Sequence, residues 1–349
     1  MIEPHDGRSP GSQRPTRLRD VAAAAGVDAS VASRVLNGDA RLSVRSETRD
    51  RVLEAAERLS YRPNRAALAL KTARTMAVGM VVPDLANPAF ALIALGAERR
   101  AAVAGYTLVL ARGSIPASLA DLQGRVDGLL VAAATSETVY RRPLFGGIPA
   151  VLVNREEPGE IASVIVDDEA GAALAIRHLL ELGHRRIAHV AGPQDADTGR
   201  RRLRGYAAAL RAGGIEVLPE WVAEASYDEA AGHLAAARLL RVRPRPTALF
   251  AANIRIAIGT LSAVRRAGLR VPEDVSIIGF DDTPLASYLD PPLTTVRMPL
   301  EELGSVAADS LLREIGGRRA ESVMVDIPAE LVVRGSAAPP PLDAAERGS

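Results

Sequence analysis

The sequence contains no cysteine, and this absence removes several kinds of chemistry at once. Disulfide bonds, thiol nucleophiles and cysteine-ligated metal sites are all excluded. Aromatic residues are scarce, at 3% of the 349 residues, whereas apolar residues make up 48% and charged residues 24%. These proportions are typical of a globular protein, and the length is sufficient for more than one domain.

Long apolar runs are absent as well. No stretch of about 18 consecutive apolar residues occurs, so we expect no transmembrane helix. The first residues, MIEPHDGRSPGSQRPTR, lack the apolar core of a secretory signal, and we expect residues 1–15 to form a disordered tail. Together these absences predict no membrane partner and a cytoplasmic location.

Motifs of the common enzyme classes are missing too. The chain has no phosphate-binding P-loop, no glycine-rich dinucleotide fingerprint after its first predicted strand, no nucleophile elbow and no HExxH zinc motif. Its histidines lack the spacing of metal ligands and are interpreted as structural or surface residues; they are His5, His178, His184, His189 and His233. We therefore expect no catalytic residue, no metal, no cofactor and no enzymatic activity.

Charge is distributed unevenly along the chain. Residues 1–75 carry a net charge of +5 and the remainder −4, although the whole chain is only +1. A basic head on an acidic body indicates that the head meets a polyanion. A chance fluctuation of five charges would give the same asymmetry, so the charge alone does not decide.

Three short helices are predicted in the basic head. Apolar residues repeat at helical spacing between Leu18 and Ala25, and Gly26 ends the first helix. The second helix follows at once, and a third is predicted from Ser46 to Ser60 with Ser46 as its N-cap. Two short helices joined by a tight turn that contains glycine are the layout of a helix-turn-helix.

The second predicted helix has an unusual polar face. Small hydroxyls, a guanidinium and an amide line one stripe of it, in the order Ser30, Ser33, Arg34 and Asn37. A recognition helix enters the major groove of DNA N-terminus first, where small residues permit close approach and polar groups reach base edges or phosphates. The stripe suits a DNA groove better than bulk water, although a buried three-helix cap would give similar spacing.

From Met76 onward the pattern changes to alternating strands and helices. Eight short apolar runs alternate with helical stretches, and they are MAVGMVVP, YTLVLAR, VDGLLVAA, PAVLVN, RRIAHVAGP, WVAEAS, TALFAAN and VSIIGFDD. This alternation predicts an α/β fold with parallel, doubly wound sheets. Because eight such units are too many for one modest sheet, we predict two α/β subdomains over residues 76–336 and a disordered tail over 337–349.

Long segments of the chain resemble a known family. RLRDVAAAAGVDASVASRVLNG and SETRDRVLEAAERLSYRPNRAALALKT resemble the DNA-binding head and hinge of the lactose and galactose repressor (LacI/GalR) family of bacterial transcriptional regulators. VDDEAGAALAIRHLLELGHRRIAHVAGP and VPEDVSIIGFDDTPLASYLDPPLTTV resemble its effector-binding core. The resemblance implies an all-α helix-turn-helix domain at residues 16–62, a hinge helix within 63–75, and a two-lobed core similar to periplasmic binding proteins.

The resemblance implies that the head binds double-stranded operator DNA as a homodimer. Ala29, Ser30 and Arg34 match the positions at which the family reads bases, whereas Arg17 stands where the family usually has a threonine, so its phosphate contact would differ. Leu70 matches a leucine that wedges open a base step in the minor groove. The residues expected at DNA are Arg17, Ala29, Ser30, Ser33, Arg34, Asn37, Asn64, Arg65 and Leu70.

The resemblance also implies a small-molecule effector bound between two lobes. Its expected contacts are Phe90, Asn154, Arg200, Asn253 and Asp281. Amide, carboxylate and guanidinium groups can together bond to the hydroxyls of a sugar. The family usually has Asn-Asp where this chain has Asn253-Ile254, so one acceptor is lost, and a sugar, a nucleoside-like molecule and no small ligand stay open. We expect Asp168 and Asp282, by contrast, only to cap helices.

The sequence is therefore interpreted as a DNA-binding transcriptional regulator. It would act as a repressor controlled by a sugar or related metabolite. The alternative is a cytoplasmic small-molecule binding protein whose head no longer recognises specific DNA, which the small side chains at Asp28, Ala29 and Ser30 favour.

Overall fold

The computed structural model describes residues 16–36, 42–61, 74–133 and 140–341. The chain divides into two compact units, Met1–Thr75 and Met76–Ser349, each with apolar core residues of its own. The predicted N-terminal tail and nearly all of the predicted hinge lie outside the described residues.

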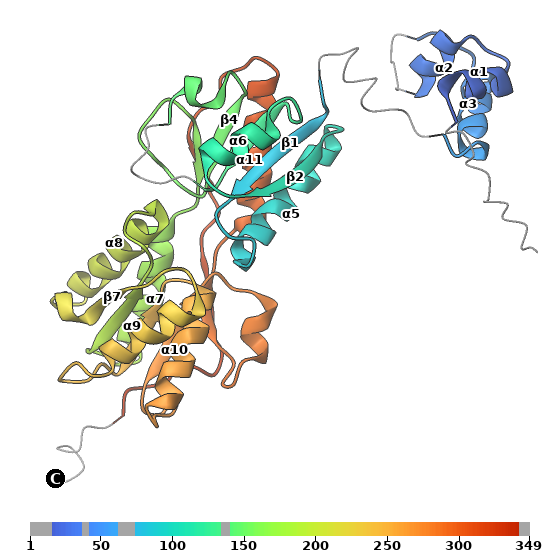
Figure 1. The fold of residues 1–349 in the computed structure, drawn as a ribbon. Helices are drawn as coiled ribbons and strands as arrows, with labels where there is room; N and C mark the ends of the chain where they lie inside the picture. Colours follow the sequence, from blue (N-terminus) through green and yellow to red (C-terminus); the bar gives the residue numbers. More distant parts are fainter. Residues whose placement is uncertain (1–15, 37–41, 62–73, 134–139, 342–349) are drawn as a thin grey trace, which may run out of the picture. The chain divides into compact units, whose positions relative to one another are not determined.

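Three helices form the described part of the first unit (Figure 1). They are α1 (Leu18–Ala25), α2 (Ala29–Leu36) and α3 (Ser46–Arg58), and their buried faces meet in one small apolar core. Gly26 ends α1 with φ +67°, a left-handed conformation that glycine adopts without the cost of a Cβ clash. The predicted helix-turn-helix layout is confirmed.

The predicted ends of the third helix need correction. Ser46 is the first helical residue of α3 and not its N-cap, because the extended residue before it is Arg45, whose side chain makes no capping bond. The helix ends at Arg58 and does not reach Ser60, which has a positive φ of 48°. The start and the end of the helix are set by the backbone conformations of Arg45 and Ser60, which cannot be predicted from the spacing of apolar residues.

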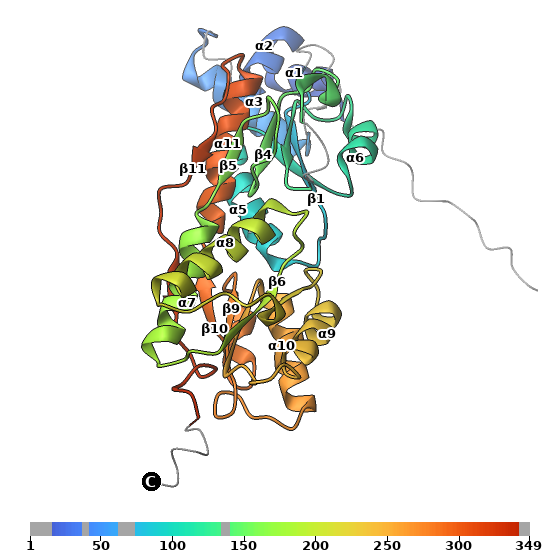
Figure 2. The ribbon, with the colours of Figure 1, turned by 90° about the vertical axis from the view of Figure 1, so that its left-hand side faces the viewer.

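The second unit contains two lobes, each with a six-stranded sheet (Figures 1 and 2). The N-lobe sheet has the strand order β11-β5-β4-β3-β1-β2. Its elements are β1 (Ala77–Val82), α5 (Pro88–Val103), β2 (Thr107–Arg112), α6 (Ile115–Leu122), β3 (Gly128–Val131), η1 (Arg142–Phe145), β4 (Ala150–Val153), β5 (Ser163–Ile165), α11 (Leu300–Ile315) and β11 (Val323–Met324).

The C-lobe repeats this plan with the strand order β12-β10-β9-β8-β6-β7. Its elements are α7 (Asp168–Glu181), β6 (Ile187–Ala191), α8 (Asp197–Ala212), η2 (Pro219–Trp221), β7 (Val222–Glu224), α9 (Glu229–Leu239), β8 (Ala248–Ala251), α10 (Ile254–Arg266), β9 (Ser276–Phe280), η3 (Pro284–Tyr288), β10 (Thr294–Arg297) and β12 (Glu330–Val332). The chain passes between the lobes after β5, after β10 and after β11.

The central strands of both sheets are buried, as parallel strands connected by crossover helices should be. Every residue of β3, β4, β8 and β9 is buried, as expected for strands that helices cover on both faces. All strand pairs are parallel except β10 with β12. The predicted two-lobed α/β core is thereby confirmed. Among the described residues, no helix is long and apolar enough to cross a membrane.

Residues 337–341, predicted to belong to a disordered tail, contact the C-lobe in the structure. The carbonyl oxygen of Ala338 lies 2.9 Å from Nε2 of His184 and accepts a hydrogen bond of 2.9 Å from the hydroxyl of Ser276. The first residues of the predicted tail, up to residue 341, therefore pack against the C-lobe, and the rest lie outside the described residues.

Candidate functional site

The face of α2 that was predicted to meet DNA is open to solvent in the first unit. Ala29, Ser30 and Arg34 are exposed, and Ser33 beside them is half-buried. The opposite face of α2 packs into the core of the three helices. The helix thus presents small side chains at its N-terminus and a guanidinium one turn later.

Arg17 lies at the start of α1 with its side chain exposed. Its backbone N–H donates to the Asp20 carboxylate at 2.7 Å, which satisfies one of the free donors at the helix N-terminus. The hydroxyl of Thr16 donates to the Leu59 carbonyl at 3.1 Å and fixes this end of α1 against α3. The remaining predicted DNA contacts fall outside the described residues; they are Asn37, Asn64, Arg65 and Leu70.

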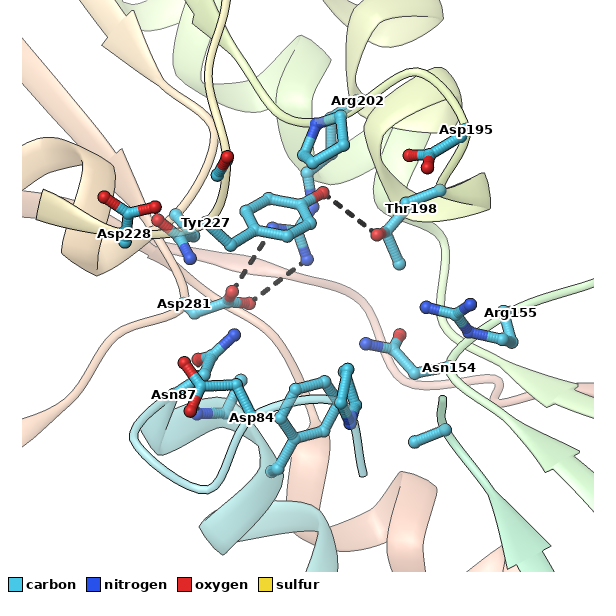
Figure 3. Close-up of a pocket in the computed structure, with 18 residues that line it drawn as sticks. Asp84, Asn87, Asn154, Arg155, Asp195, Thr198, Arg202, Tyr227, Asp228 and Asp281 are labelled. Carbon is cyan, nitrogen blue, oxygen red and sulfur yellow. Dashed lines mark hydrogen bonds and ion pairs between the residues drawn. The ribbon is translucent and has the colours of Figure 1, made fainter. Parts of the chain in front are cut away.

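A cleft of about 310 Å³ lies between the two lobes of the second unit (Figure 3). Its polar walls come from residues that follow the carboxyl ends of strands, among them Asn154 after β4, Asn253 after β8 and Asp281 after β9. Carboxyl ends of parallel strands are where α/β proteins bind ligands. Of the five predicted effector contacts, four line this cleft: Phe90, Asn154, Asn253 and Asp281.

Arg202 and Asp281 form a buried ion pair in the wall of the cleft. Two nitrogens of the guanidinium lie 3.2 and 3.4 Å from the two carboxylate oxygens (Figure 3). The same guanidinium donates to Asp168 at 2.7 Å and lies 4.1 Å from the centre of the Phe280 ring. Burial raises the pKa of the Asp281 carboxyl, and the adjacent Arg202 opposes that rise. The charged form of Asp281 is therefore stabilised by the arginine.

Arg200, the fifth predicted contact, is not in the wall of the cleft. Its guanidinium lies 3.4 Å from Glu157 of the other lobe and donates to the carbonyls of Gln194 and Asp195 at 3.2 Å. Residues two positions apart on a helix point to nearly opposite sides, so Arg200 and Arg202 cannot both face the cleft. Three successive arginines occur here, residues 200–202, and the rotation of α8 about its axis determines which of them faces the cleft.

Several buried polar atoms along the cleft have no hydrogen-bond partner among the described residues. They are Oδ1 of Asn154, Nε of Arg155 and Nδ2 of Asn253. The amide of Asn253 is held in one orientation, because its Oδ1 accepts a 2.7 Å bond from the backbone N–H of Ile256 and caps α10. Its Nδ2 is then left as a donor, and ligand hydroxyls would satisfy such groups.

Two aromatic side chains flank the polar groups. Phe90 comes from α5 of the N-lobe and Tyr227 follows β7 of the C-lobe. The Tyr227 hydroxyl lies 3.0 Å from the hydroxyl of Thr198, and burial raises the pKa of this tyrosine, so it stays protonated. Sequence reasoning missed Arg155, Thr198, Arg202 and Tyr227; of these, Arg155 and Tyr227 follow predicted strands, and that position could have indicated them.

Asp168 and Asp282 do not cap helices, contrary to expectation. The neighbouring Asp167 caps α7 instead. Asp168 is fully buried and pairs with Arg202, whereas Asp282 pairs with Arg334 at 2.8 Å. Both carboxylates face arginines from distant segments, which local sequence does not reveal.

Two family models match the chain. Residues 17–64 match the model described as bacterial regulatory proteins, lacI family, and residues 176–337 match a periplasmic binding protein-like domain. The first match covers the helix-turn-helix, and the second covers most of the C-lobe together with α11 and β11 of the N-lobe.

Individual proteins are similar over nearly the whole length. The HTH-type transcriptional repressor PurR of Edwardsiella ictaluri is 35% identical, over 93% of this chain and 97% of that protein. The regulator CelR in complex with cellobiose is 36% identical, with a TM-score of 0.70, over 93% of this chain and 100% of that one. The lac repressor dimer bound to operator and the anti-inducer ONPF is 30% identical, with a TM-score of 0.77 and the same coverage. The chain therefore belongs to the lacI family of bacterial regulatory proteins and is a DNA-binding transcriptional regulator with an effector-binding core.

Proposed function

We propose that this protein is a homodimeric repressor whose affinity for its operator changes when a polyhydroxylated metabolite binds in the cleft. This proposal is carried by the buried polar atoms of Asn154, Arg155 and Asn253 that line the cleft between the two lobes and have no hydrogen-bond partner in the described part of the chain. Burying these polar atoms without hydrogen bonds costs free energy, and a ligand rich in hydroxyl groups would supply the missing bonds.

On DNA, α2 would enter the major groove through its N-terminus. Ala29 and Ser30 allow close approach, Ser33 and Arg34 reach base edges, and exposed Arg17 contacts a phosphate. Asn37, Asn64, Arg65 and Leu70 complete the surface, with Leu70 acting in the minor groove. Two copies are needed because a dimer reads two half-sites, and the lac repressor relative binds its operator as a dimer.

In the cleft, the ligand would lie between Phe90 and Tyr227 and bond to the polar groups around it. The buried pair of Arg202 and Asp281 offers donors and acceptors to adjacent hydroxyls, as expected of a sugar site. The relative CelR binds cellobiose. Ile254 supplies no acceptor where the resemblance expects an aspartate, so we infer a ligand with fewer donor groups at the N-terminus of α10.

We assign no catalytic residue and no cofactor to the cleft. A regulator that binds operator DNA works where the chromosome lies, and we therefore place the protein in the cytoplasm as a soluble homodimer.

The test is selection of binding sites from a randomised duplex pool at near-physiological salt, because contacts to phosphate are strongly salt-dependent. We expect enrichment of a two-fold palindrome. Arg34→Ala should weaken binding to it by about 1–3 kcal/mol and relax the base preference at one position per half-site. Arg58→Ala, which removes an exposed arginine of α3, serves as the matched control and should leave that preference intact. No enriched palindrome, or unchanged binding by Arg34→Ala, would contradict the assignment.

A further inference from the structure

Arg255 joins the two lobes at the edge of the cleft. It is the second residue of α10 in the C-lobe, and its Nε and Nη2 atoms donate to the Glu229 carboxylate of the same lobe at 2.8 and 2.7 Å. Its Nη1 atom donates at 2.6 Å to Asp84, which follows β1 of the N-lobe. One guanidinium therefore binds a carboxylate from each lobe.

Asp84 is held so that its charge faces Arg255. One carboxylate oxygen accepts a 2.9 Å bond from the backbone N–H of Ala86, and the other accepts from Arg255. The Ala86 N–H and Arg255 both lower the pKa of the Asp84 carboxyl, which stays ionised at neutral pH. Because Asp84 also lines the cleft, this ion pair lies beside the space that the proposed ligand would occupy.

The far side of the cleft is joined differently. There the Asp197 carboxylate of the C-lobe accepts from the backbone N–H of Glu156 in the N-lobe at 2.9 Å, and Asp197 is buried. Figure 3 shows Asp84 and Arg155 on opposite sides of the cleft. In contrast to Asp197, the Asp84 side chain is 46% exposed and Arg255 is 15% exposed, so solvent and salt reach the pair.

We propose that Arg255 is a latch: it holds the lobes together through Asp84 and thereby sets how readily the cleft closes on its effector. The inference rests on the proposed function, since closure of the lobes matters to DNA only if the cleft controls operator binding. A partly exposed pair is weak enough to break and reform, as a control element must. Glu229 orients the arginine and does not itself connect the lobes.

The experiment measures the separation of the lobes directly, without DNA or ligand. Because the chain has no cysteine, spin labels can be placed on the full-length protein through Asp121→Cys on α6 and Leu234→Cys on α9. Both positions are exposed, and Figure 2 shows α6 and α9 on the same side of the two lobes. Pulsed EPR then gives the distribution of distances between them.

Matched variants separate the latch from its neighbours. Asp84→Asn removes the charge and keeps an acceptor for the Ala86 N–H, and Arg255→Gln removes the other partner. Glu229→Gln removes a carboxylate from the same arginine without crossing between lobes. The latch predicts that the ratio of separated to closed lobes rises about fivefold in Asp84→Asn and in Arg255→Gln, and rises no further in the double variant. Glu229→Gln keeps one acceptor for the arginine and the whole Asp84 contact, so it should shift the distribution less than either latch substitution.

Salt provides a second arm that needs no latch variant. In 1 M NaCl the label distances of the otherwise unsubstituted protein should shift in the same direction as in Asp84→Asn, because salt screens the partly exposed pair of Asp84 with Arg255 and also the pair of Arg200 with Glu157. An unchanged distribution in Asp84→Asn and in high salt would overturn the proposal, as would additive effects of the two latch substitutions. Failure of the proposed function would show separately, as absence of an operator for the protein while the distances respond as predicted.

Discussion

His189, which was interpreted as a structural residue, has a pKa that its buried surroundings lower. It is completely buried on β6, with its ring stacked 5.0 Å from Tyr206 and 4.7 Å from Phe250 between ring centres. Its Nδ1 donates to the carbonyl of Phe250 at 3.0 Å. Burial among these groups lowers the pKa of His189 to about 4.

This shift predicts a loss of stability in mild acid. Between about pH 6.5 and pH 4 the unfolded chain binds a proton at this position and the folded chain does not, so the free energy of unfolding falls as the pH falls through that window. At about 1.4 kcal/mol per pH unit, His189 contributes a loss of about 2 kcal/mol between pH 6.5 and pH 5. Urea unfolding at both pH values measures it.

The variant His189→Phe should reduce that pH-dependence and leave the part due to His184, whose pKa burial also lowers. His233→Asn on α9 is the control and should keep the dependence of the unsubstituted protein. Equal slopes for the unsubstituted protein and His189→Phe would show that the buried ring does not carry the effect.

Asn253 has two separable tasks at the residue scale. Its Oδ1 caps α10 and its Nδ2 faces the cleft without a partner. Asn253→Ser should keep the stability, since serine caps helices about as well as asparagine, whereas Asn253→Ala should cost about 1 kcal/mol. Both should lose the ligand's effect on operator affinity; thermal unfolding and operator titration separate the two tasks. An intact response in Asn253→Ser would refute the role of Nδ2.

Sequence reasoning reached the residues of the cleft unevenly. Asn154, Asn253 and Asp281 were identifiable because each follows an apolar run that is recognisable as a strand. Arg202 was missed in favour of Arg200, because the choice depends on the rotation of α8 relative to the cleft. That rotation is fixed by packing between segments far apart in the chain.

At the scale of elements, α5 and α11 meet more closely than ordinary helices. A Cβ on Gly96 would lie 1.8 Å from the carbonyl oxygen of Glu301, and one on Gly304 would lie 1.9 Å from that of Ile93. Backbone therefore contacts backbone, and neither position has space for a methyl group. The contact lies within the N-lobe and fixes α11, the helix that begins where the chain returns from the C-lobe.

Gly96→Ala is expected to destabilise the second unit by about 3 kcal/mol, because helix backbones cannot move apart without loosening the core around them. Denaturant unfolding of the full chain measures the loss. Gly335→Ala is the control, since its added Cβ would meet Pro292 at an ordinary 3.5 Å. A Gly96→Ala protein as stable as that control would contradict the close approach of the helices.

Element prediction succeeded where the pattern was strong. The eight apolar runs correspond to strands β1 to β4 and β6 to β9. Strands β5, β10, β11 and β12 were not predicted. They lie at one end of each sheet, and their pairing with neighbouring strands, which local sequence does not show, defines them.

At the scale of the whole molecule, control of operator binding requires that the ligand favour one arrangement of the lobes. A ligand that bound all arrangements equally would change nothing. The sequence indicated two lobes and a head, but the ion pair between Asp84 and Arg255 joins positions that only the folded core brings together. Such long-range pairs are what a linear pattern cannot report.

A ligand in the cleft is expected to change the affinity of the protein for its operator. The most direct test titrates the selected operator by fluorescence anisotropy in the presence of a panel of disaccharides, pentoses and nucleosides, with Phe90→Ala alongside. This substitution removes an aromatic wall of the cleft without disturbing its buried charges. We predict that at least one compound changes the Kd of the unsubstituted protein for operator by about 5–150-fold and leaves Phe90→Ala nearly unaffected. An operator affinity that no compound alters, or that changes equally in both proteins, would contradict the account.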